Sequence, residues 1–268
     1  MIGRVILPGT GLNVSRLSFG TASLHHLHSS RARQALLQAA LDIGITHFDT
    51  SPYYGFCLAE RELGVFHERN RGVITMATKV GLYPPGSQSQ GSVSVWTRKI
   101  IGKAIPRLSR AVVDWSVSVA EKSLQRSLKR LKTARIDLLL LHEPSPQALD
   151  SEEFLSWLDA QERKGTLRYW GLAGNVAPMA KWLAGNHPLG RILQVKDSLS
   201  RREADVIAGT GRELQITYGY FHASERASGA RATGEVLTRA LQRNKTGSVL
   251  FSTRRRERLA IMPGLESR

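Results

Sequence analysis

Short apolar runs alternate with amphipathic segments along almost the whole chain. In residues 117–131 apolar side chains recur every three or four positions, as on one face of a helix. Residues 136–141 are almost continuously apolar, which is typical of a strand buried on both faces. By these criteria, strands are predicted over residues 16–21, 46–51, 73–80, 136–142, 169–174, 192–196, 214–220 and 248–252. Helices are predicted over residues 31–43, 58–66, 117–131, 152–163, 178–183, 202–207, 235–242 and 254–261.

Eight strand–helix alternations over about 250 residues match the number of units and the length of an α/β fold of the (β/α)8 barrel type, which this pattern therefore predicts. A doubly wound sheet stays open as an alternative, because strand order cannot be read from the pattern. No segment has the composition of a linker, so residues 1–268 are predicted to form one domain. Residues 82–113 form a long loop after the third strand, and we interpret it as either an active-site flap or a disordered surface insertion.

Composition places the chain among soluble globular proteins. Its 268 residues are 41% hydrophobic and 22% charged, and no apolar stretch approaches the length that spans a bilayer. No signal peptide is expected at the N-terminus. The one cysteine, Cys57, cannot form an internal disulfide, which is consistent with a reducing compartment, so a cytoplasmic location is expected. No ligand cluster has zinc-like spacing, and no metal is expected.

The formal net charge of +16 is unusual for this composition. Such an excess can serve nucleic acid, an acidic membrane surface or phosphorylated ligands, or it can reflect a compositional preference for exposed arginine. Residues 82–113 carry basic side chains without any acidic one, but aromatic residues are not interleaved densely enough for a single-strand binding platform. No specific nucleic-acid or membrane partner is therefore expected.

Four polar residues stand at or just after the ends of three predicted strands: Asp49, Tyr54, Lys79 and His142. In a barrel they would surround one mouth. A lysine ammonium beside a tyrosine is expected to lower the phenol pKa, and an aspartate paired with the lysine keeps it cationic. A histidine can orient a substrate carbonyl. Singly, each has an ordinary structural explanation, such as a helix cap for Asp49, but the set is suited to protonating a carbonyl oxygen while hydride reaches the carbon.

The sequence resembles the aldo-keto reductase family along almost its whole length. Several segments carry this resemblance. They are LPGTGLNVSRLSFGT at 7–21, the region 39–50 followed by Tyr54-Gly55, ATK at 77–79 and DLLLLH at 137–142. The resemblance implies a (β/α)8 barrel with an N-terminal β-hairpin that binds a nicotinamide dinucleotide without a Rossmann fold. It also implies that Tyr54 is the general acid, that Asp49 and Lys79 support it, and that His142 orients the carbonyl.

The resemblance extends to residues that would hold the cofactor. Gly174 and Asn175 align with the pair that holds the nicotinamide carboxamide, although Gly174 replaces the usual serine. Gln194 matches the glutamine that contacts the same amide, and Tyr218 matches the aromatic residue that stacks on the nicotinamide ring.

Near the end of the chain, the resemblance assigns the adenosine phosphate to Ser252, Thr253 and Arg258. The arginines at 254–256 and 258 favour NADP(H), because a guanidinium pairs well with its extra phosphate, while NAD(H) stays open. The chain ends soon after residue 264, and with short C-terminal loops we expect broad or unusual substrate selectivity.

The leading hypothesis is therefore an NADP(H)-dependent oxidoreductase that acts on an aldehyde or ketone, or on an alcohol or sugar lactol in reverse. The alternative is a nucleotide-binding regulatory or scaffold subunit of the same fold with little turnover. The partner is expected to be a small-molecule carbonyl or alcohol substrate, and the protein a monomer or small homo-oligomer.

Overall fold

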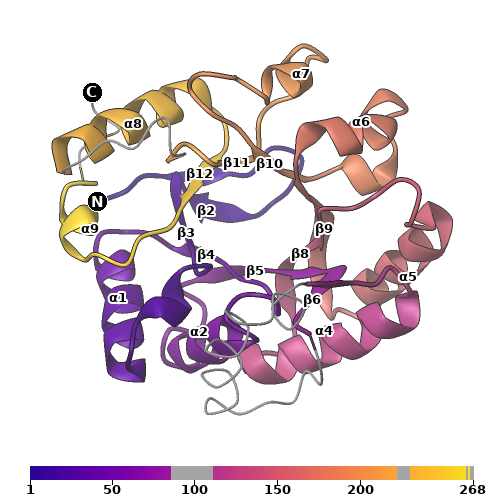
Figure 1. Ribbon diagram of the computed structural model, residues 1–268, viewed down its shortest axis with the longest axis horizontal. Coiled ribbons are helices and arrows are strands. Elements are labelled where there is room, and N and C mark those ends of the chain that lie inside the picture. The colour runs from indigo at the N-terminus through magenta and orange to yellow at the C-terminus, as the bar shows by residue number, and fades with distance from the viewer. Residues whose placement is uncertain (86–110, 222–229, 264, 266–268) are drawn as a thin grey trace, which may run out of the picture.

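In the computed structural model, parallel strands close into a barrel at the centre and helices surround it (Figure 1). The structure describes residues 1–85, 111–221, 230–263 and 265. The barrel strands are β3 (Leu17–Gly20), β4 (His47–Asp49), β5 (Thr75–Val80), β8 (Ile136–His142), β9 (Leu167–Gly174), β10 (Leu193–Lys196), β11 (Ile216–Tyr218) and β12 (Ser248–Phe251). They follow one another around the barrel in chain order, and β12 pairs with β3 to close it. All eight predicted strands are present, and the barrel prediction is confirmed against the doubly wound sheet.

Helices cover the outside of the barrel. They are α1 (Ser30–Asp42), α2 (Leu58–Arg69), α4 (Val117–Leu131), α5 (Ser151–Arg163), α6 (Val176–Ala184), α7 (Asp205–Ala208), α8 (Ala230–Arg243) and α9 (Glu257–Ala260), with 3-10 turns η1 (Leu24–His26) and η3 (Pro188–Gly190). The predicted helices at 202–207 and 254–261 shrink to α7 and α9, each about one turn long. Thr253 contributes to the late start of α9, because its Oγ1 accepts a bond from Arg255 N at 3.1 Å and holds the backbone in a turn.

Helix α4 has the bounds that its periodicity predicts. Its apolar stripe, which includes Leu124 and Leu128, is buried against the barrel. Helices α2 and α4 meet closely at Gly64, where an added Cβ would lie 1.9 Å from the carbonyl oxygen of Arg130. A side chain at Gly64 would force the two helices apart.

A hairpin of β1 (Arg4–Ile6) and β2 (Asn13–Ser15) precedes the barrel, as the resemblance implies. Apolar side chains of the hairpin region form one buried cluster with inward-facing side chains of the strands. This inner cluster is Leu7, Leu12, Val14, Ala77, Leu138, Leu140, Ala173, Ile192, Ile216 and Leu250. The hairpin therefore packs against the amino ends of the strands and adds to the apolar filling inside the barrel, and a separate, larger core lies between the strands and the helices.

The predicted long loop begins and ends in a small antiparallel pair that the pattern did not predict, β6 (Leu82–Tyr83) with β7 (Val112–Val113). Residues 86–110 lie outside the described residues, and with them the two interpretations of the loop and all of its basic side chains.

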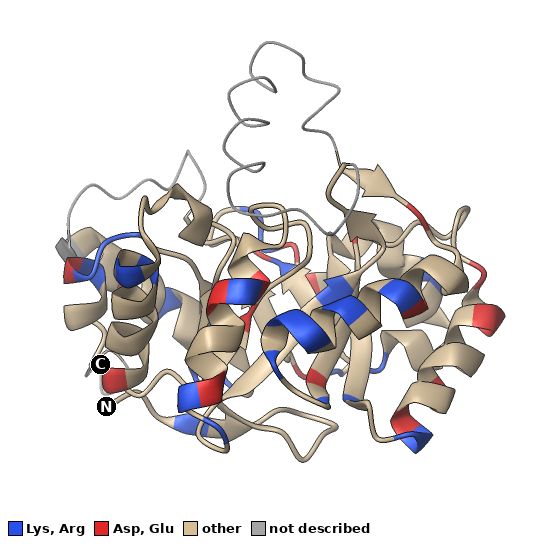
Figure 2. Cartoon of the chain, turned by 90° about the horizontal axis from the view of Figure 1, so that it is seen from below, with Lys and Arg blue, Asp and Glu red and all other residues tan. Residues whose placement is uncertain are grey.

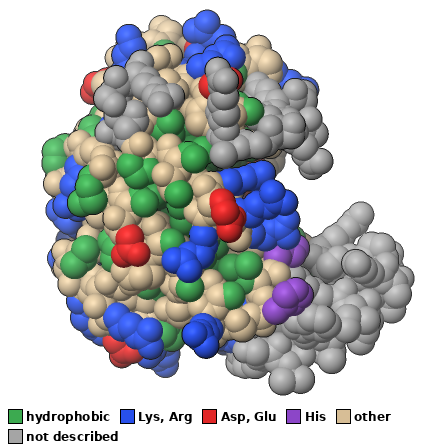
Figure 3. All heavy atoms as spheres, turned by 90° about the vertical axis from the view of Figure 1, so that its left-hand side faces the viewer, with side chains coloured by type: hydrophobic (Ala, Val, Ile, Leu, Met, Phe, Trp, Pro, Cys, Tyr) green, Lys and Arg blue, Asp and Glu red, His purple; other side chains and the backbone are tan. Residues whose placement is uncertain are grey.

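Basic and acidic residues are interspersed along the helices and connecting loops (Figure 2). On the face over α1, α8 and α9, lysine and arginine side chains form several groups separated by uncharged surface (Figure 3). Among the described residues, no helix combines the length and apolar character needed to cross a membrane.

Candidate active site

The two-residue alternation of the strands carries polar side chains into the upper barrel. In β5, Met76 faces the helices, whereas Ala77 belongs to the inner cluster, so Lys79 follows Ala77 on the inward side. In β8, Leu140 belongs to the inner cluster in the same way, and His142 follows it. Each of these polar side chains therefore lies one layer above the apolar filling, at the carboxyl ends of the strands.

A pocket of about 620 Å³ opens at this end of the barrel. Seven of the eleven predicted site residues line it: Asp49, Tyr54, Lys79, His142, Gln194, Tyr218 and Ser252. The four that do not are Gly174, Asn175, Thr253 and Arg258. Sequence reasoning missed Glu143 and Lys196, which also line the pocket. Their signal was position alone, since each stands at or next to the end of a predicted strand.

Lys79 and Asp49 form a buried ion pair at the base of the pocket. Lys79 Nζ donates to Asp49 Oδ1 at 2.5 Å and to the carbonyl oxygen of Thr50 at 2.9 Å, and the two side chains are 1% and 3% exposed. Burial lowers the pKa of Lys79, and the Asp49 carboxylate opposes that shift. Burial raises the pKa of Asp49, and the ammonium of Lys79 opposes this in turn. Each charge therefore depends on the other.

Tyr54 lies beside this pair, with its ring centroid 4.9 Å from Lys79 Nζ. The expectation that Lys79 lowers the pKa of Tyr54 is wrong. Burial raises this pKa well above the ordinary value of 10, and the negative charges of Asp49 and Glu143 raise it further. The ammonium is already matched by Asp49, so little positive charge is left to stabilise a phenolate. Tyr54 is a protonated phenol at neutral pH.

His142 faces Tyr54 across the pocket, with the two ring centroids 6.0 Å apart and the rings nearly perpendicular. Burial, together with the charge of Lys79, lowers the pKa of His142 to about 3. Its imidazole is therefore neutral at physiological pH, with one protonated nitrogen and one lone pair. The buried Nδ1 atom has no hydrogen-bond partner among the described residues. A neutral ring of this kind can hydrogen-bond a substrate oxygen without adding charge.

Gln194 and Tyr218 lie on adjacent strands of the same pocket wall. Gln194 is 3% exposed, and a hydrogen bond from it lowers the pKa of Asp49, opposing the larger effect of burial. Its other polar atom, Oε1, is buried and has no partner among the described residues. Burial raises the pKa of Tyr218, as do the nearby charge of Glu143 and a hydrogen bond to it. The wall thus offers an unused acceptor and an aromatic ring.

Asn175 stands just beyond the end of β9 and contacts the pocket through Glu143. Its backbone nitrogen and its Nδ2 donate to Glu143 Oε2 at 3.3 Å and 3.2 Å. Gly174 lies between Asn175 and the barrel, with φ of +147°. These residues are brought to the rim of the site, on the same side as Gln194 and Tyr218.

The predicted phosphate residues are less closely gathered. Ser252 lines the pocket and its Oγ donates to the carbonyl oxygen of Gly20 at 2.8 Å. Thr253 is buried in the turn before α9, and Arg258 lies within α9. Arg254, together with the two arginines that follow it, is exposed. The three predicted anchors are therefore successive parts of one segment, of which only Ser252 reaches the pocket.

A buried acidic residue, Glu60, links the helices outside the barrel to the strand that carries Lys79. Glu60 on α2 accepts from Thr78 Oγ1 at 2.7 Å and from Arg130 Nε at 2.6 Å. Its charge also raises the pKa of Lys79, against the larger effect of burial. Glu60 therefore joins α2, α4 and β5 next to the Lys79–Asp49 pair.

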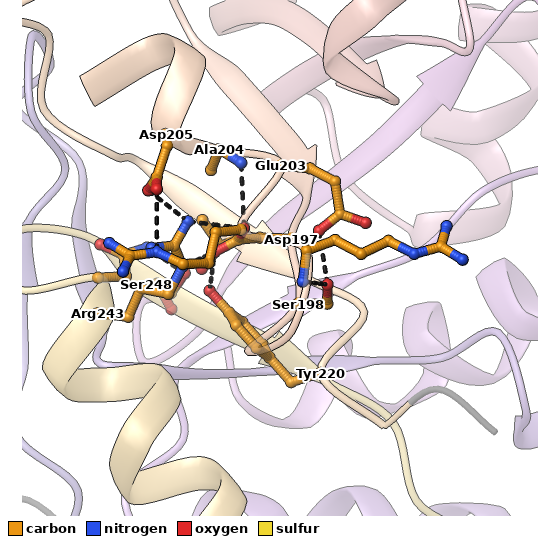
Figure 4. Close-up of polar contacts among 12 residues, drawn as sticks. Asp197, Ser198, Glu203, Ala204, Asp205, Tyr220, Arg243 and Ser248 are labelled. Carbon is orange, nitrogen blue, oxygen red and sulfur yellow. Dashed lines mark hydrogen bonds and ion pairs between the residues drawn. The ribbon is translucent and has the colours of Figure 1, made fainter. Parts of the chain in front are cut away.

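A second network holds the other wall (Figure 4). Asp197, just after β10, is fully buried, and its carboxylate accepts from Tyr220 at 2.8 Å and from both Nε and Nη2 of Arg243. Arg243, at the end of α8, also pairs with Asp205 at 2.8 Å. The backbone nitrogen of Asp197 donates to the carbonyl oxygen of Tyr218 at 2.7 Å. The network fixes the ends of β10 and β11, which carry Gln194 and Tyr218.

Among the described residues, no three histidine, cysteine, aspartate or glutamate side chains come together as a metal site. The polar groups of the pocket include two phenols, the ammonium–carboxylate pair of Lys79 and Asp49, a neutral imidazole, the Gln194 amide, and the charged side chains of Glu143 and Lys196. Such a set can exchange a proton with a substrate oxygen and hold it in place.

The sequence profile of the aldo/keto reductase family matches residues 16–200. The chain belongs to this family. The match covers the first six barrel strands and all four residues of the Asp49, Tyr54, Lys79 and His142 set. The recognition made from the sequence motifs is confirmed, and so is the barrel fold that it implies.

Two curated relatives are similar over part of this aldo/keto reductase chain. D-threo-aldose 1-dehydrogenase from a Pseudomonas species is 33% identical over 145 residues, which are 52% of this chain and 43% of the relative. L-galactose dehydrogenase from Arabidopsis thaliana is 28% identical over 194 residues, which are 69% of this chain and 53% of the relative. The chain thus spans about half the length of the curated relatives that it matches.

A solved structure agrees with the fold over nearly all of the chain. An aldo-keto reductase from Bacillus halodurans superposes with a TM-score of 0.77 at 18% identity, covering 99% of this chain and 91% of that chain. At this identity the likeness supports the barrel fold alone.

Proposed function

We propose that this chain is a nicotinamide-dependent oxidoreductase that interconverts a carbonyl and an alcohol, with Tyr54 exchanging the proton. The observation that carries the proposal is the meeting of Asp49, Tyr54, Lys79 and His142 in one pocket with an unused acceptor on Gln194. We further propose that residues 1–268 form one domain of this fold.

The pocket residues fit a nicotinamide. Gln194 Oε1 is a buried acceptor in need of a donor, which a carboxamide NH2 group supplies. Tyr218 offers a ring for stacking, and Asn175 lies at the rim next to Glu143. A bound nicotinamide would supply hydride for carbonyl reduction and accept it in alcohol oxidation.

In reduction, the Tyr54 hydroxyl gives its proton to the substrate oxygen while hydride reaches the carbonyl carbon, so the C=O bond becomes a C–OH group. The phenolate that remains lies beside the Lys79 ammonium. In oxidation, the C–H bond breaks with loss of hydride, and the hydroxyl proton passes to the Tyr54 phenolate. His142, neutral and facing Tyr54, holds the substrate oxygen by a hydrogen bond.

The family relatives guide the choice of substrate. Two of them are named for aldose and galactose dehydrogenation. We therefore propose sugars and small aldehydes as the substrate class. We propose NADP(H) as the preferred dinucleotide because the exposed arginines at 254–256 adjoin Ser252 at the pocket edge, and guanidinium groups pair well with a phosphate.

The test compares the parent protein with Tyr54→Phe, which removes the acidic hydroxyl and keeps the ring. Each is titrated with NADPH, NADH and their oxidised forms by calorimetry, and then assayed with aldehydes and with aldoses. We expect both proteins to bind the dinucleotides and only the parent to turn over. Failure of the parent to bind any of the four would overturn the proposal.

A different outcome would favour a nucleotide-binding regulatory or scaffold subunit. If the parent binds dinucleotide tightly and no aldehyde, ketone, alcohol or aldose is converted, the catalytic assignment of Tyr54 is wrong and that second function gains. Turnover in Tyr54→Phe at the parental rate would likewise contradict the role of Tyr54.

A further inference from the structure

Glu143 is directed across the mouth of the barrel by an unusual backbone conformation. It directly follows His142 and has a φ of 54°, in the left-handed region that non-glycine residues seldom occupy. In this turn its backbone nitrogen donates to the carbonyl oxygen of Ala173 at 2.7 Å. The end of β8 is thereby tied to the end of β9, and the Glu143 side chain lies over Gly174.

The carboxylate occupies space that a side chain at position 174 would need. A Cβ added to Gly174 would lie 2.6 Å from Glu143 Oε2. The serine usual at this position in the family would therefore require the Glu143 carboxylate to move from where it is placed here. Glycine at position 174 and glutamate at position 143 form one arrangement.

The charge of Glu143 is not neutralised by a partner. Its hydrogen bonds come from the neutral Asn175 side chain and backbone and from the neutral Tyr218. Within the part of the chain that the structure describes, no lysine, arginine or histidine forms an ion pair with it. The carboxylate thus lines the pocket without a cation paired to it among the described residues.

The two residues that Glu143 contacts, Asn175 and Tyr218, are those proposed above to hold a nicotinamide. A nicotinamide held by both residues would be near the carboxylate that contacts them. The oxidised nicotinamide ring carries one positive charge and the reduced ring carries none, so a neighbouring anion stabilises the oxidised form selectively. Closing the pocket around the ring strengthens this effect, because water is displaced from between the charges.

We propose that Glu143 is a specificity-determining residue that makes the site bind the oxidised dinucleotide more tightly relative to the reduced one. The inference rests on the proposed function. By linkage, a residue that stabilises bound NADP+ relative to bound NADPH shifts the equilibrium between the bound reactants toward the oxidised dinucleotide and the alcohol.

The experiment measures the dissociation constants of NADP+ and NADPH at one ionic strength by calorimetry. It compares the parent with Glu143→Gln, which removes the charge and keeps the size and an acceptor oxygen. The matched control is Glu213→Gln, which removes an exposed carboxylate just before β11, at the opposite end of the barrel. Glu143→Asp, which keeps the charge, is the rescue variant.

In Glu143→Gln we expect the ratio of the NADP+ to the NADPH dissociation constant to rise by about three- to tenfold. Glu213→Gln should leave the ratio unchanged, and Glu143→Asp should stay nearer to the parent than Glu143→Gln does. These variants differ in charge while keeping a similar side chain, so a loss of structure would weaken both dinucleotides together and leave the ratio unchanged.

An unchanged ratio in Glu143→Gln, with both dinucleotides still bound, would overturn this inference and leave the proposed function intact. A parent protein that binds neither dinucleotide would overturn the proposed function and this inference with it. An equal change in Glu143→Asp and Glu143→Gln would show that shape, and not charge, governs the preference, and would also overturn the inference.

Discussion

Lys79 Nζ lies 2.5 Å from Asp49 Oδ1, and both side chains are shut off from solvent inside the barrel. A buried ion pair of this kind is costly to break, because either partner alone is a charge without compensation. The pair also sets the electrostatic surroundings of Tyr54, because the Lys79 ammonium lies 4.9 Å from the centroid of the Tyr54 ring.

Asp49→Asn should lower the free energy of unfolding by about 3 kcal/mol, because it leaves the Lys79 ammonium buried without its anion. Urea denaturation at pH 7 measures the change. The double variant Asp49→Asn with Lys79→Met should recover part of the loss, since the unpaired charge is then absent. As a control, Glu68→Gln removes the carboxylate of an exposed pair with Lys132 and should leave stability unchanged within error. A double variant no more stable than Asp49→Asn would contradict this account.

Alcohol oxidation should accelerate with rising pH throughout the range in which the protein stays folded. The raised pKa of Tyr54, set by burial and by the charges of Asp49 and Glu143, keeps the phenolate scarce. Lys79 and the neutral His142 both lie near the Tyr54 phenol, so this pH dependence requires that neither changes its charge over the same range. The pairing of Lys79 with Asp49 keeps the charge of Lys79 constant. Profiles of kcat/KM against pH test the expectation, and Glu143→Gln should move the rise to lower pH. A profile that levels off below pH 8 would be inconsistent with the raised pKa.

Acid should destabilise the protein through His47, which is fully buried in β4. Burial, with the charge of Lys79, lowers its pKa from the ordinary 6.5 to about 4. Because the unfolded chain binds the proton first, this stabilisation is complete above pH 6.5 and is lost as the pH falls toward 4. The slope from one such group is about 1.4 kcal/mol per pH unit. His142 contributes in the same direction.

His47→Gln should flatten this dependence by about one proton between pH 4 and 6.5, as urea denaturation at several pH values would show. Glutamine cannot titrate there but retains a polar group for Thr75, whose Oγ1 lies 2.8 Å from His47 Nδ1. If the free energy of unfolding depends on pH with the same slope in the variant and the parent, His47 is not the titrating group.

Gly64→Ala should destabilise the protein by about 1–3 kcal/mol, because its Cβ would overlap the carbonyl oxygen of Arg130 and separate α2 from α4. The matched control is Gly185→Ala at the end of α6, where an added Cβ meets nothing within 4 Å. That change should alter stability by no more than about 0.5 kcal/mol. Thermal and urea unfolding compare the two, and equal effects would refute the close-approach argument.

Arg243→Met should cost about 3 kcal/mol of stability, because Asp197 would lose its buried cation. Tyr220→Phe removes one hydrogen bond to the same carboxylate and should cost about 1 kcal/mol. The difference between the two variants in urea denaturation tests whether the ion pair dominates the network. A larger loss for Tyr220→Phe would reverse that ranking.

The periodicity of the sequence was enough to place all eight barrel strands and the bounds of α4, because alternation and helical spacing are local properties. The spacing from Asp49 to Tyr54, with Lys79 and His142 at strand ends, was enough to predict that these four side chains meet at one pocket. These residues come together because parallel strands of a barrel share their carboxyl end. The same local pattern predicted a final helix that is too long. The hydrogen bond from Arg255 N to Thr253 Oγ1 holds a turn before α9, which begins later than predicted.

Tertiary structure alone decided which charges neighbour one another. Asp197 and Arg243 are 46 residues apart, and no periodicity links them. The direction of the Tyr54 pKa depends on the sum of burial and of charges from Asp49 and Glu143, which come from separate strands. Glu143 reads in sequence as an ordinary surface residue before a proline, and only the left-handed turn at the end of β8 brings its carboxylate to Asn175 and Tyr218. Electrostatic interactions weaken with the distance between the charges, and the positions of two residues along the sequence do not give that distance.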